Sequence, residues 1–211
     1  MNRRDFMKLQ AAALAGLAVG GPSILTPPKL SAQALPDVAV VKGTPAAATR
    51  RAVEMVGGIG RFVKPGQKVV VKPNMSFART PEAASNTHPE VVRELVIMCK
   101  EAQAGSVLVL DHSLSDPKRS LEQSGILAAC EGVEKNICFH LMDNKFYQHA
   151  DLADGVEMKS NAFMRDVLDA DVIIACPVAK SDGGAGVSLS LTGQMGLIHD
   201  RGSMHSKYSR A

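Results

Sequence analysis

The segment Val69-Val70-Val71-Lys72-Pro73-Asn74-Met75-Ser76 is the most informative one for the fold, because three consecutive apolar residues are followed at once by polar ones. A short run that is apolar at every position predicts a strand covered on both faces, which is typical of a parallel sheet. Residues 107–110, which end at Asp111, and residues 172–175 form two further runs of this kind. The remaining predicted strands are residues 38–41 and 137–142.

Helical patterns alternate with these runs. Thr44-Pro45 supplies an N-cap and a first-turn proline to a helix that extends to about residue 56, and Thr87 with Glu90 forms a capping box for a longer one. Two shorter helices are predicted at residues 121–130 and 163–168. This alternation predicts an α/β domain over residues 35–211, with a mostly parallel sheet and helices on both faces, a Rossmann-like three-layer arrangement.

The N-terminus resembles a twin-arginine (Tat) signal peptide. Arg3-Arg4 is followed by Phe6 and then by a weakly apolar stretch, residues 9–19, which is too short to span a bilayer as a helix. Ala32-Gln33-Ala34 offers the small residues that signal peptidase requires. We therefore expect residues 1–34 to direct export by the twin-arginine translocase to the periplasm or another extracytoplasmic space, without a permanent membrane anchor.

Charge and cysteine content exclude several classes of function. The chain carries 24 Lys and Arg against 21 Asp and Glu, but the excess lies in residues 1–34, so residues 35–211 are balanced. With this balance and no tryptophan, we expect no nucleic-acid partner. The four cysteines form no C-x-x-C pair, which argues against an iron–sulfur or structural zinc site. They are expected to be small buried hydrophobes, and disulfides between them remain open.

Parallel sheets place ligand sites at the carboxyl ends of their strands, and polar residues follow these strands here. Lys72 and Lys180 are predicted to bracket a small anion, aided by backbone N–H groups of the glycine-rich turn, residues 182–186, and the start of a following helix. The predicted ligand-binding residues are Lys72, Asn74, Ser76, Asp111, Ser113, Gly183, Gly184 and Arg201.

Metal binding and catalysis are alternatives at the same edge. Asp111, His88 and His112 could supply one carboxylate and two imidazoles, a common transition-metal set, so a metal cofactor remains open although no cofactor is identified. If the protein is an enzyme, Lys180 or His205 would serve as acid or base. The sequence leaves open whether it is an enzyme at all.

The order of these motifs resembles the domain of unknown function 362 family over nearly all of residues 35–211. The matching segments are Lys72-Pro73-Asn74, Thr87-His88-Pro89-Glu90, the strand ending in Asp111, Asp171-Val172-Ile173-Ile174 leading to Lys180, and Leu191-Thr192-Gly193-Gln194-Met195-Gly196 with Asp200-Arg201 and Met204-His205. The resemblance implies an α/β fold and, in some members, a twin-arginine signal. It names no reaction.

Two departures from the family pattern bear on function. Lys180-Ser181-Asp182 stands where the family often has Lys-Thr-His, and Leu191-Thr192-Gly193-Gln194-Met195-Gly196 where it often has Leu-Lys-Asn-Leu-Met-Gly. Family members also continue past the Met-His pair, which leaves open whether this chain is a fragment lacking a C-terminal part. The expected function is binding of a small anionic ligand or a metal-containing cofactor, with or without catalysis. The alternative is a non-catalytic accessory or redox-associated periplasmic protein.

Overall fold

A computed structural model describes residues 35–156, 158–184 and 186–202 of the chain, and these residues all belong to one compact unit. The predicted signal peptide, residues 1–34, and His205 lie outside the described residues. The cleavage site after Ala34 therefore stays a prediction.

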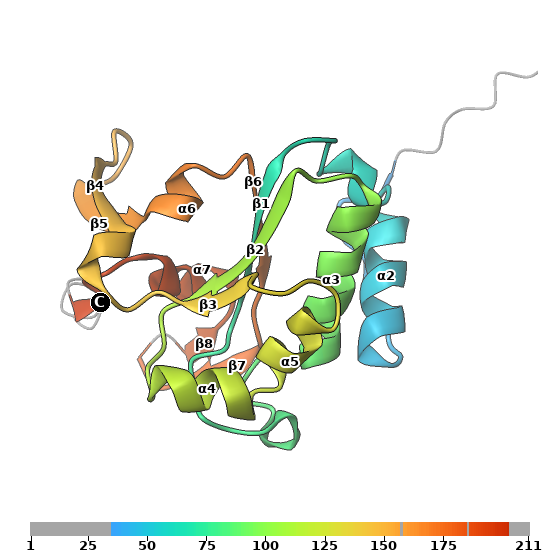
Figure 1. Ribbon diagram of the computed structural model, residues 1–211, viewed down its shortest axis with the longest axis horizontal. Helices are drawn as coiled ribbons and strands as arrows, with labels where there is room; N and C mark the ends of the chain where they lie inside the picture. The colour runs from blue at the N-terminus through green and yellow to red at the C-terminus, as the bar shows by residue number, and fades with distance from the viewer. Residues whose placement is uncertain (1–34, 157, 185, 203–211) are drawn as a thin grey trace, which may run out of the picture. The chain divides into compact units, whose positions relative to one another are not determined.

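The core of the fold is a parallel sheet of four strands in the order β3-β2-β1-β6 (Figure 1). These strands are β1 (Lys68–Pro73), β2 (Ser106–Asp111), β3 (Cys138–His140) and β6 (Val172–Cys176). In β1, Val69 and Val71 face one apolar cluster, whereas Val70 faces a second cluster on the other side of the sheet. Continuous apolar runs form here because both faces are covered, which confirms the predicted α/β fold.

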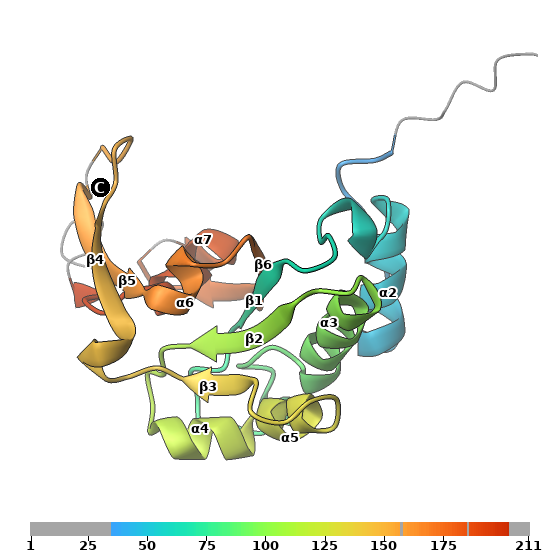
Figure 2. The same cartoon turned by 45° about the horizontal axis from the view of Figure 1, so that its top comes forward.

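Helices α2 (Pro45–Met55), α3 (Pro89–Glu101), α4 (Pro117–Gln123) and α5 (Ile126–Glu131) lie on one side of the sheet. Helix α3 buries Val92, Val96 and Cys99 against the strands, and Figure 2 shows α2 packed outside α3. Residues 121–130 were predicted as one helix, but the helix is interrupted between α4 and α5 at Gly125, whose φ is 72°. A left-handed residue interrupts the helical hydrogen bonds, which single-helix periodicity does not reveal.

The other side of the sheet carries the hairpin of β4 (Tyr147–Asp151) and β5 (Ser160–Met164), the short helix α6 (Arg165–Leu168), and the C-terminal part of the described chain (Figures 1 and 2). Met164, Val167 and Leu197 pack against Val70 and Leu110 in the second cluster. The helix predicted at 163–168 is thus confirmed only for its last four residues. Phe163 and Met164 pair with β4 before α6 begins.

Two other predictions for the N-terminal half were wrong. Residues 38–41 form no strand, and Val38 and Val40 are 75% and 90% exposed. Helix α3 is capped by His88, whose side chain accepts a hydrogen bond from the Glu90 N–H, and not by Thr87. The Thr87 hydroxyl instead donates to the Cys176 carbonyl, so it ties the loop after β1 to the end of β6.

The glycine-rich segment also differs from expectation. Strands β7 (Lys180–Asp182) and β8 (Gly186–Ser188) form an antiparallel hairpin, with Gly183 and Gly184 in its turn. The one-turn helix α7 (Ser190–Gly193) and the 3-10 segment η4 (Gln194–Leu197) follow only after this hairpin. Gly183 and Gly184 therefore form the turn of a β-hairpin, and no helix begins at them.

Three further 3-10 segments complete the described structure, η1 (Ile59–Arg61), η2 (Pro81–Ala83) and η3 (Asn144–Phe146). Across the described ranges, no helix combines the length and apolar character needed to cross a membrane.

Candidate functional site

A cleft of about 780 Å³ opens at the carboxyl ends of the strands. From β1 the chain proceeds to β2 and β3 on one side and later returns to place β6 on the other, so the connections diverge beside β1. Such a switch point is where parallel sheets form ligand sites. The lining includes Lys72, Asn74, Ser76, Phe77, Asp111, His112, Lys180, Asp182, Met195, Gly196, His199, Asp200 and Arg201.

A buried ion pair forms the base of this cleft. Lys72 Nζ lies 2.9 Å from Asp111 Oδ1, and the two side chains are 4% and 1% exposed. Lys72 also donates to the Pro73 carbonyl at 2.6 Å. Asp111 Oδ1 accepts from the His112 N–H, and Oδ2 accepts from the Met75 N–H and the Ser76 hydroxyl. This density of hydrogen bonds is what a buried charge requires, because desolvation otherwise outweighs the attraction between the ions.

Gly196 covers the ion pair from the side of η4. A Cβ placed on this residue would lie 2.2 Å from Asp111 Oδ1 and 2.9 Å from Lys72 Cε. Its φ is not in the left-handed region, so glycine is needed for space and not for backbone conformation. The sequence Gln194-Met195-Gly196 thus contains a residue that fixes how closely η4 approaches β1 and β2.

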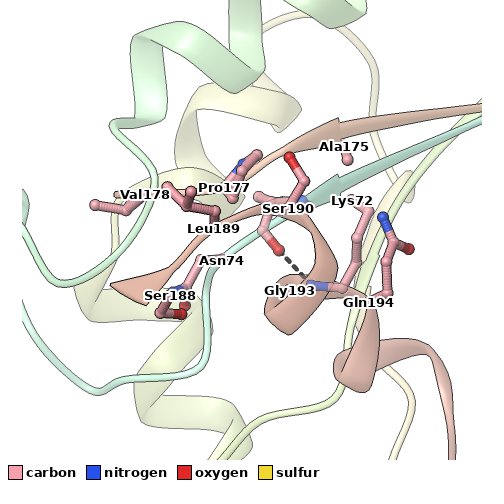
Figure 3. Close-up of a pocket in the computed structure, with 11 residues that line it drawn as sticks. Lys72, Asn74, Ala175, Pro177, Val178, Ser188, Leu189, Ser190, Gly193 and Gln194 are labelled. Atoms are coloured by element: carbon pink, nitrogen blue, oxygen red, sulfur yellow. Dashed lines mark hydrogen bonds between the residues drawn. The ribbon is translucent and has the colours of Figure 1, made fainter. Parts of the chain in front are cut away.

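Lys72 also borders a cavity of about 10 Å³, the size of one water molecule, on the side of α7 (Figure 3). Asn74, Ser190, Gly193 and Gln194 contribute to its lining. Lys72 therefore borders both this small cavity and the main cleft.

Lys180 and Arg201 lie on the walls of the cleft. Lys180 Nζ donates to the Ser85 carbonyl at 3.1 Å and lies 4.7 Å from the centroid of the Phe77 ring. Partial burial lowers the pKa of Lys180, and the Asp111 charge opposes that shift. The Arg201 guanidinium donates to the carbonyls of His112 and Ser113 at 3.2 and 3.0 Å. Five N–H donors are available on an arginine, so two backbone carbonyls leave it capacity for a ligand.

His112 is buried beneath the same cleft. Its Nδ1 lies 3.2 Å from both the Ile198 carbonyl and the Tyr147 hydroxyl, and that hydroxyl donates to the Leu141 carbonyl at 2.6 Å. Burial, followed by the Arg201 charge, lowers the pKa of His112. The ring is therefore neutral near pH 7.

The wall that carries His199 is positioned by β5. Phe163 and Ile198 form an antiparallel bridge, and the His199 N–H donates to the Ala162 carbonyl at 2.9 Å. The His199 ring packs edge-on against Tyr147, with centroids 4.9 Å apart. The β4–β5 hairpin therefore supports one side of the cleft.

The structure brings together most of the predicted site residues. Lys72, Asn74, Ser76, Asp111, His112, Lys180 and Arg201 all line the cleft. Ser113 lies beneath it, where its hydroxyl donates to the Ser76 carbonyl. Gly183 and Gly184 are in the β7–β8 turn and do not line the cleft, and the predicted catalytic His205 is outside the described residues.

The predicted metal ligands are not assembled. His88 caps α3, while both carboxylate oxygens of Asp111 are engaged by Lys72 and by backbone and hydroxyl donors. Within the described ranges, no three His, Cys, Asp or Glu side chains are grouped so that they could hold a metal ion.

Several cleft residues were not selected from the sequence. Gly196 and Asp200 lie in the segment quoted for the family resemblance, but only contacts in space show that Gly196 packs on the ion pair. Tyr147 comes from an element that the sequence did not place near β2, whereas His199 was considered beside Asp111 and His112 only as a possible metal ligand. A fixed partner for His112 has no local signature, since its contacts come from residues far along the chain.

Comparisons with known proteins agree with this placement of motifs. The sequence model of a family described as "Domain of unknown function (DUF362)" matches residues 69–211. The thylakoid-associated protein sll1697 of Synechocystis sp. is 25% identical to this chain over 156 residues. That alignment covers 74% of this chain and 47% of the relative, so the chain spans about half the length of the curated relative it matches.

Proposed function

Because the chain belongs to the DUF362 family, whose description names no activity, we propose its function from the cleft: the protein binds a small anionic molecule between Lys180 and Arg201. The observation that carries the proposal is that neither cation forms an ion pair with a carboxylate among the residues described, although both line the cleft. Partly desolvated cations with unused donors favour a bound anion.

Lys72 contributes differently from the role expected at first. Asp111 neutralises its charge, and the pair is nearly inaccessible to solvent. The pair therefore provides a rigid floor, and Lys180 and Arg201 provide the positive charge that meets a ligand. A cleft of about 780 Å³ suits a small molecule or cofactor.

Titration calorimetry with succinate, a simple dianion, tests this proposal. Substituting Lys180→Met should weaken binding by at least about tenfold, which corresponds to about 1.4 kcal/mol, within the range for a hydrogen bond to a charged group. Lys135→Met, at an exposed site away from the cleft, is the matched control and should bind as the unmodified chain does. Equal affinity in Lys180→Met and the control would contradict the proposal.

Arg201 is tested in the same way with more attention to folding. Arg201→Lys keeps the charge but loses the planar fork that contacts two carbonyls. We expect weaker succinate binding than in Arg119→Lys, a change at an exposed arginine. Circular dichroism and the urea midpoint establish that each variant is folded.

A catalytic role for Lys180 belongs to the same proposal, because a lysine with a lowered pKa is a better base at neutral pH. A metal-containing cofactor has less support from the described residues, since they assemble no three-ligand set. Native mass spectrometry and elemental analysis of protein purified under mild conditions distinguish the two cases. Stoichiometric metal would overturn the preference for a simple anion.

We also propose export by the twin-arginine route to an extracytoplasmic space. Arg3-Arg4 and the following apolar stretch support it. Replacing both arginines by lysine should leave the protein in the cytoplasm. The shorter chain that lacks residues 1–34 should then be missing from the exported fraction. Export that is unaffected by the double substitution would contradict this route.

The alternative function is a non-catalytic accessory protein that works near a membrane. The name of the Synechocystis relative, which associates with thylakoids, favours it. Fractionation of the exported protein tests it: recovery with membranes, released by salt, would support an accessory role over a freely diffusing enzyme.

A further inference from the structure

We infer that His112 is a specificity-determining residue of the cleft, where its unprotonated Nε2 accepts a hydrogen bond from a hydroxyl group on the anion held by Lys180 and Arg201. The ligand class is therefore a hydroxylated organic anion, such as a hydroxycarboxylate. This inference rests on the proposed anion binding and deepens it. It assigns a role to a side chain that was otherwise only a candidate metal ligand.

The first step concerns the proton on Nδ1. The Tyr147 hydroxyl has one hydrogen, and its 2.6 Å contact with the Leu141 carbonyl uses it. Tyr147 can therefore only accept from His112 Nδ1, at 3.2 Å. The Ile198 carbonyl, also at 3.2 Å from Nδ1, has no hydrogen to give either. Both neighbours thus require a proton on Nδ1, which fixes the tautomer.

The second step concerns the other ring nitrogen. In a neutral imidazole with a proton on Nδ1, Nε2 carries a lone pair and acts as an acceptor. The titratable or charged groups that face the ring are Arg201, Asp111, His199 and Tyr147. Burial and the Arg201 cation both disfavour a second proton on the ring, and the Asp111 carboxylate opposes them with a smaller effect.

The third step places Nε2 at the cleft. His112 lines the cleft, and its Nε2 has no hydrogen-bond partner in the described part of the chain. Nε2 of His140 is buried away from solvent without a partner, but Nε2 of His112 is not buried in this way. An acceptor therefore faces the same space as two cationic donors.

This combination selects between anions. The lone pair of Nε2 repels the oxygens of a fully deprotonated anion, but it binds an O–H group carried next to the charge. Asp182 and Asp200 also line the cleft, and their carboxylates add negative charge to it. A hydroxyl donor beside a carboxylate satisfies both kinds of group, because it presents a negative end to Lys180 and Arg201 and a hydrogen to His112.

The tautomer is tested by NMR on protein labelled with ¹⁵N at histidine. Long-range ¹H–¹⁵N correlations near pH 7 should show His112 protonated at Nδ1 and bare at Nε2, with the signal assigned by its loss in His112→Asn. In Tyr147→Phe the Ile198 carbonyl still accepts from Nδ1, so the same tautomer is expected. A bare Nδ1, or a doubly protonated ring, would overturn the inference without touching the proposed anion site.

The ligand class is tested with malate and succinate, which have the same charge and differ by one hydroxyl. The unmodified chain should prefer malate by about tenfold, the value of one hydrogen bond. His112→Asn keeps a donor near the Nδ1 position but lacks Nε2, so it should bind both equally, at the affinity that the unmodified chain has for succinate. His149→Asn, on an exposed part of β4, is the matched control and should retain the preference.

The outcomes separate the two claims. Succinate binding that depends on Lys180, without a preference for malate, would overturn the role of His112 and leave anion binding in place. A malate preference that persists in His112→Asn would do the same. Binding of neither compound by the unmodified chain would contradict both claims.

Discussion

Gly196 packs so closely on the Lys72–Asp111 ion pair that Gly196→Ala should destabilise the fold. The added Cβ would lie 2.2 Å from Asp111 Oδ1, 2.9 Å from Lys72 Cε and 3.0 Å from Lys72 Nζ. Real contacts of this kind do not occur at 2.2 Å, so either η4 must move away from the sheet or the ion pair must separate.

The two ways to relieve this clash give a lower and an upper estimate of the loss in the free energy of unfolding. Overpacking a well-packed site costs about 1–3 kcal/mol, and separating a buried ion pair costs about 3–5 kcal/mol. We expect a loss of about 3 kcal/mol in the free energy of unfolding, which is a large part of the roughly 5–15 kcal/mol that stabilises a typical domain. Gly196→Val, with a larger side chain, should cost more.

Urea unfolding followed by circular dichroism measures this loss. Gly60→Ala is the matched control, because a Cβ at that position meets nothing within 4 Å and its φ is not left-handed. The control should change stability by less than about 0.5 kcal/mol. A similar small change for Gly196→Ala would refute the argument that this glycine makes room for the ion pair.

A double-mutant cycle identifies the contact responsible. In a chain that already carries Asp111→Ala, the Oδ1 atom is absent and only the contacts with the flexible end of Lys72 remain, so Gly196→Ala should cost clearly less than in the unmodified chain. The two changes would then be strongly non-additive, as expected for residues in direct contact. Additive effects would show that the destabilisation arises elsewhere.

Further tests concern a loop hydrogen bond of Thr87, the buried ring of His140 and two buried thiols. Thr87→Ala should cost about 1–3 kcal/mol in urea unfolding, because it leaves the buried Cys176 carbonyl without its donor, whereas Thr87→Ser should be milder. Burial lowers the pKa of His140 in the folded chain. Just below the usual histidine pKa of about 6.5, the unfolded chain therefore binds more protons than the folded chain, so the free energy of unfolding should rise with pH. This rise should be steeper in the unmodified chain than in His140→Phe. Burial raises the pKa of Cys99 to about 11 and of Cys176 to about 12, so a thiol reagent at neutral pH should label them only after urea unfolds the chain.

The parallel strands could be predicted from the sequence because their runs are apolar at every position. Strand β1 is covered on both faces, whereas Ile173 of β6 is 44% exposed. Each of the runs at residues 69–71, 107–110 and 172–175 lies in a parallel strand. Such runs are apolar at every position for a local reason, and the pattern survives whatever neighbours they acquire. The helix that follows Thr44 was predicted for the same kind of reason, since a first-turn proline acts within one turn, although the Thr44 side chain makes no capping hydrogen bond.

The errors have non-local causes. Thr87 matches a capping box, but its hydroxyl is used by the end of β6, and His88 caps the helix instead. Residues 38–41 are as apolar as a strand but have no partner to pair with among the described residues. A hydrogen-bond partner or a strand partner that lies far along the chain leaves no mark on the local pattern.

The candidate site shows the same division. The sequence predicted which loops meet, because the carboxyl ends of parallel strands share one edge of a sheet. It did not predict that Lys72 is neutralised by Asp111, which leaves Lys180 and Arg201 to face the cleft. Whether a lysine is a binding group or half of a buried pair depends on a single distance between residues on different strands.

Local patterns and their order were enough to predict the α/β sheet, the edge at which polar residues gather and the family of the chain. The folded structure assigns these residues their roles. It paired Lys72 with Asp111, packed Gly196 on that pair and fixed the proton of His112 through Tyr147 and Ile198. The physical reason is that charge, tautomer and close packing are properties of contacts between distant segments, and such contacts exist only once the chain is folded.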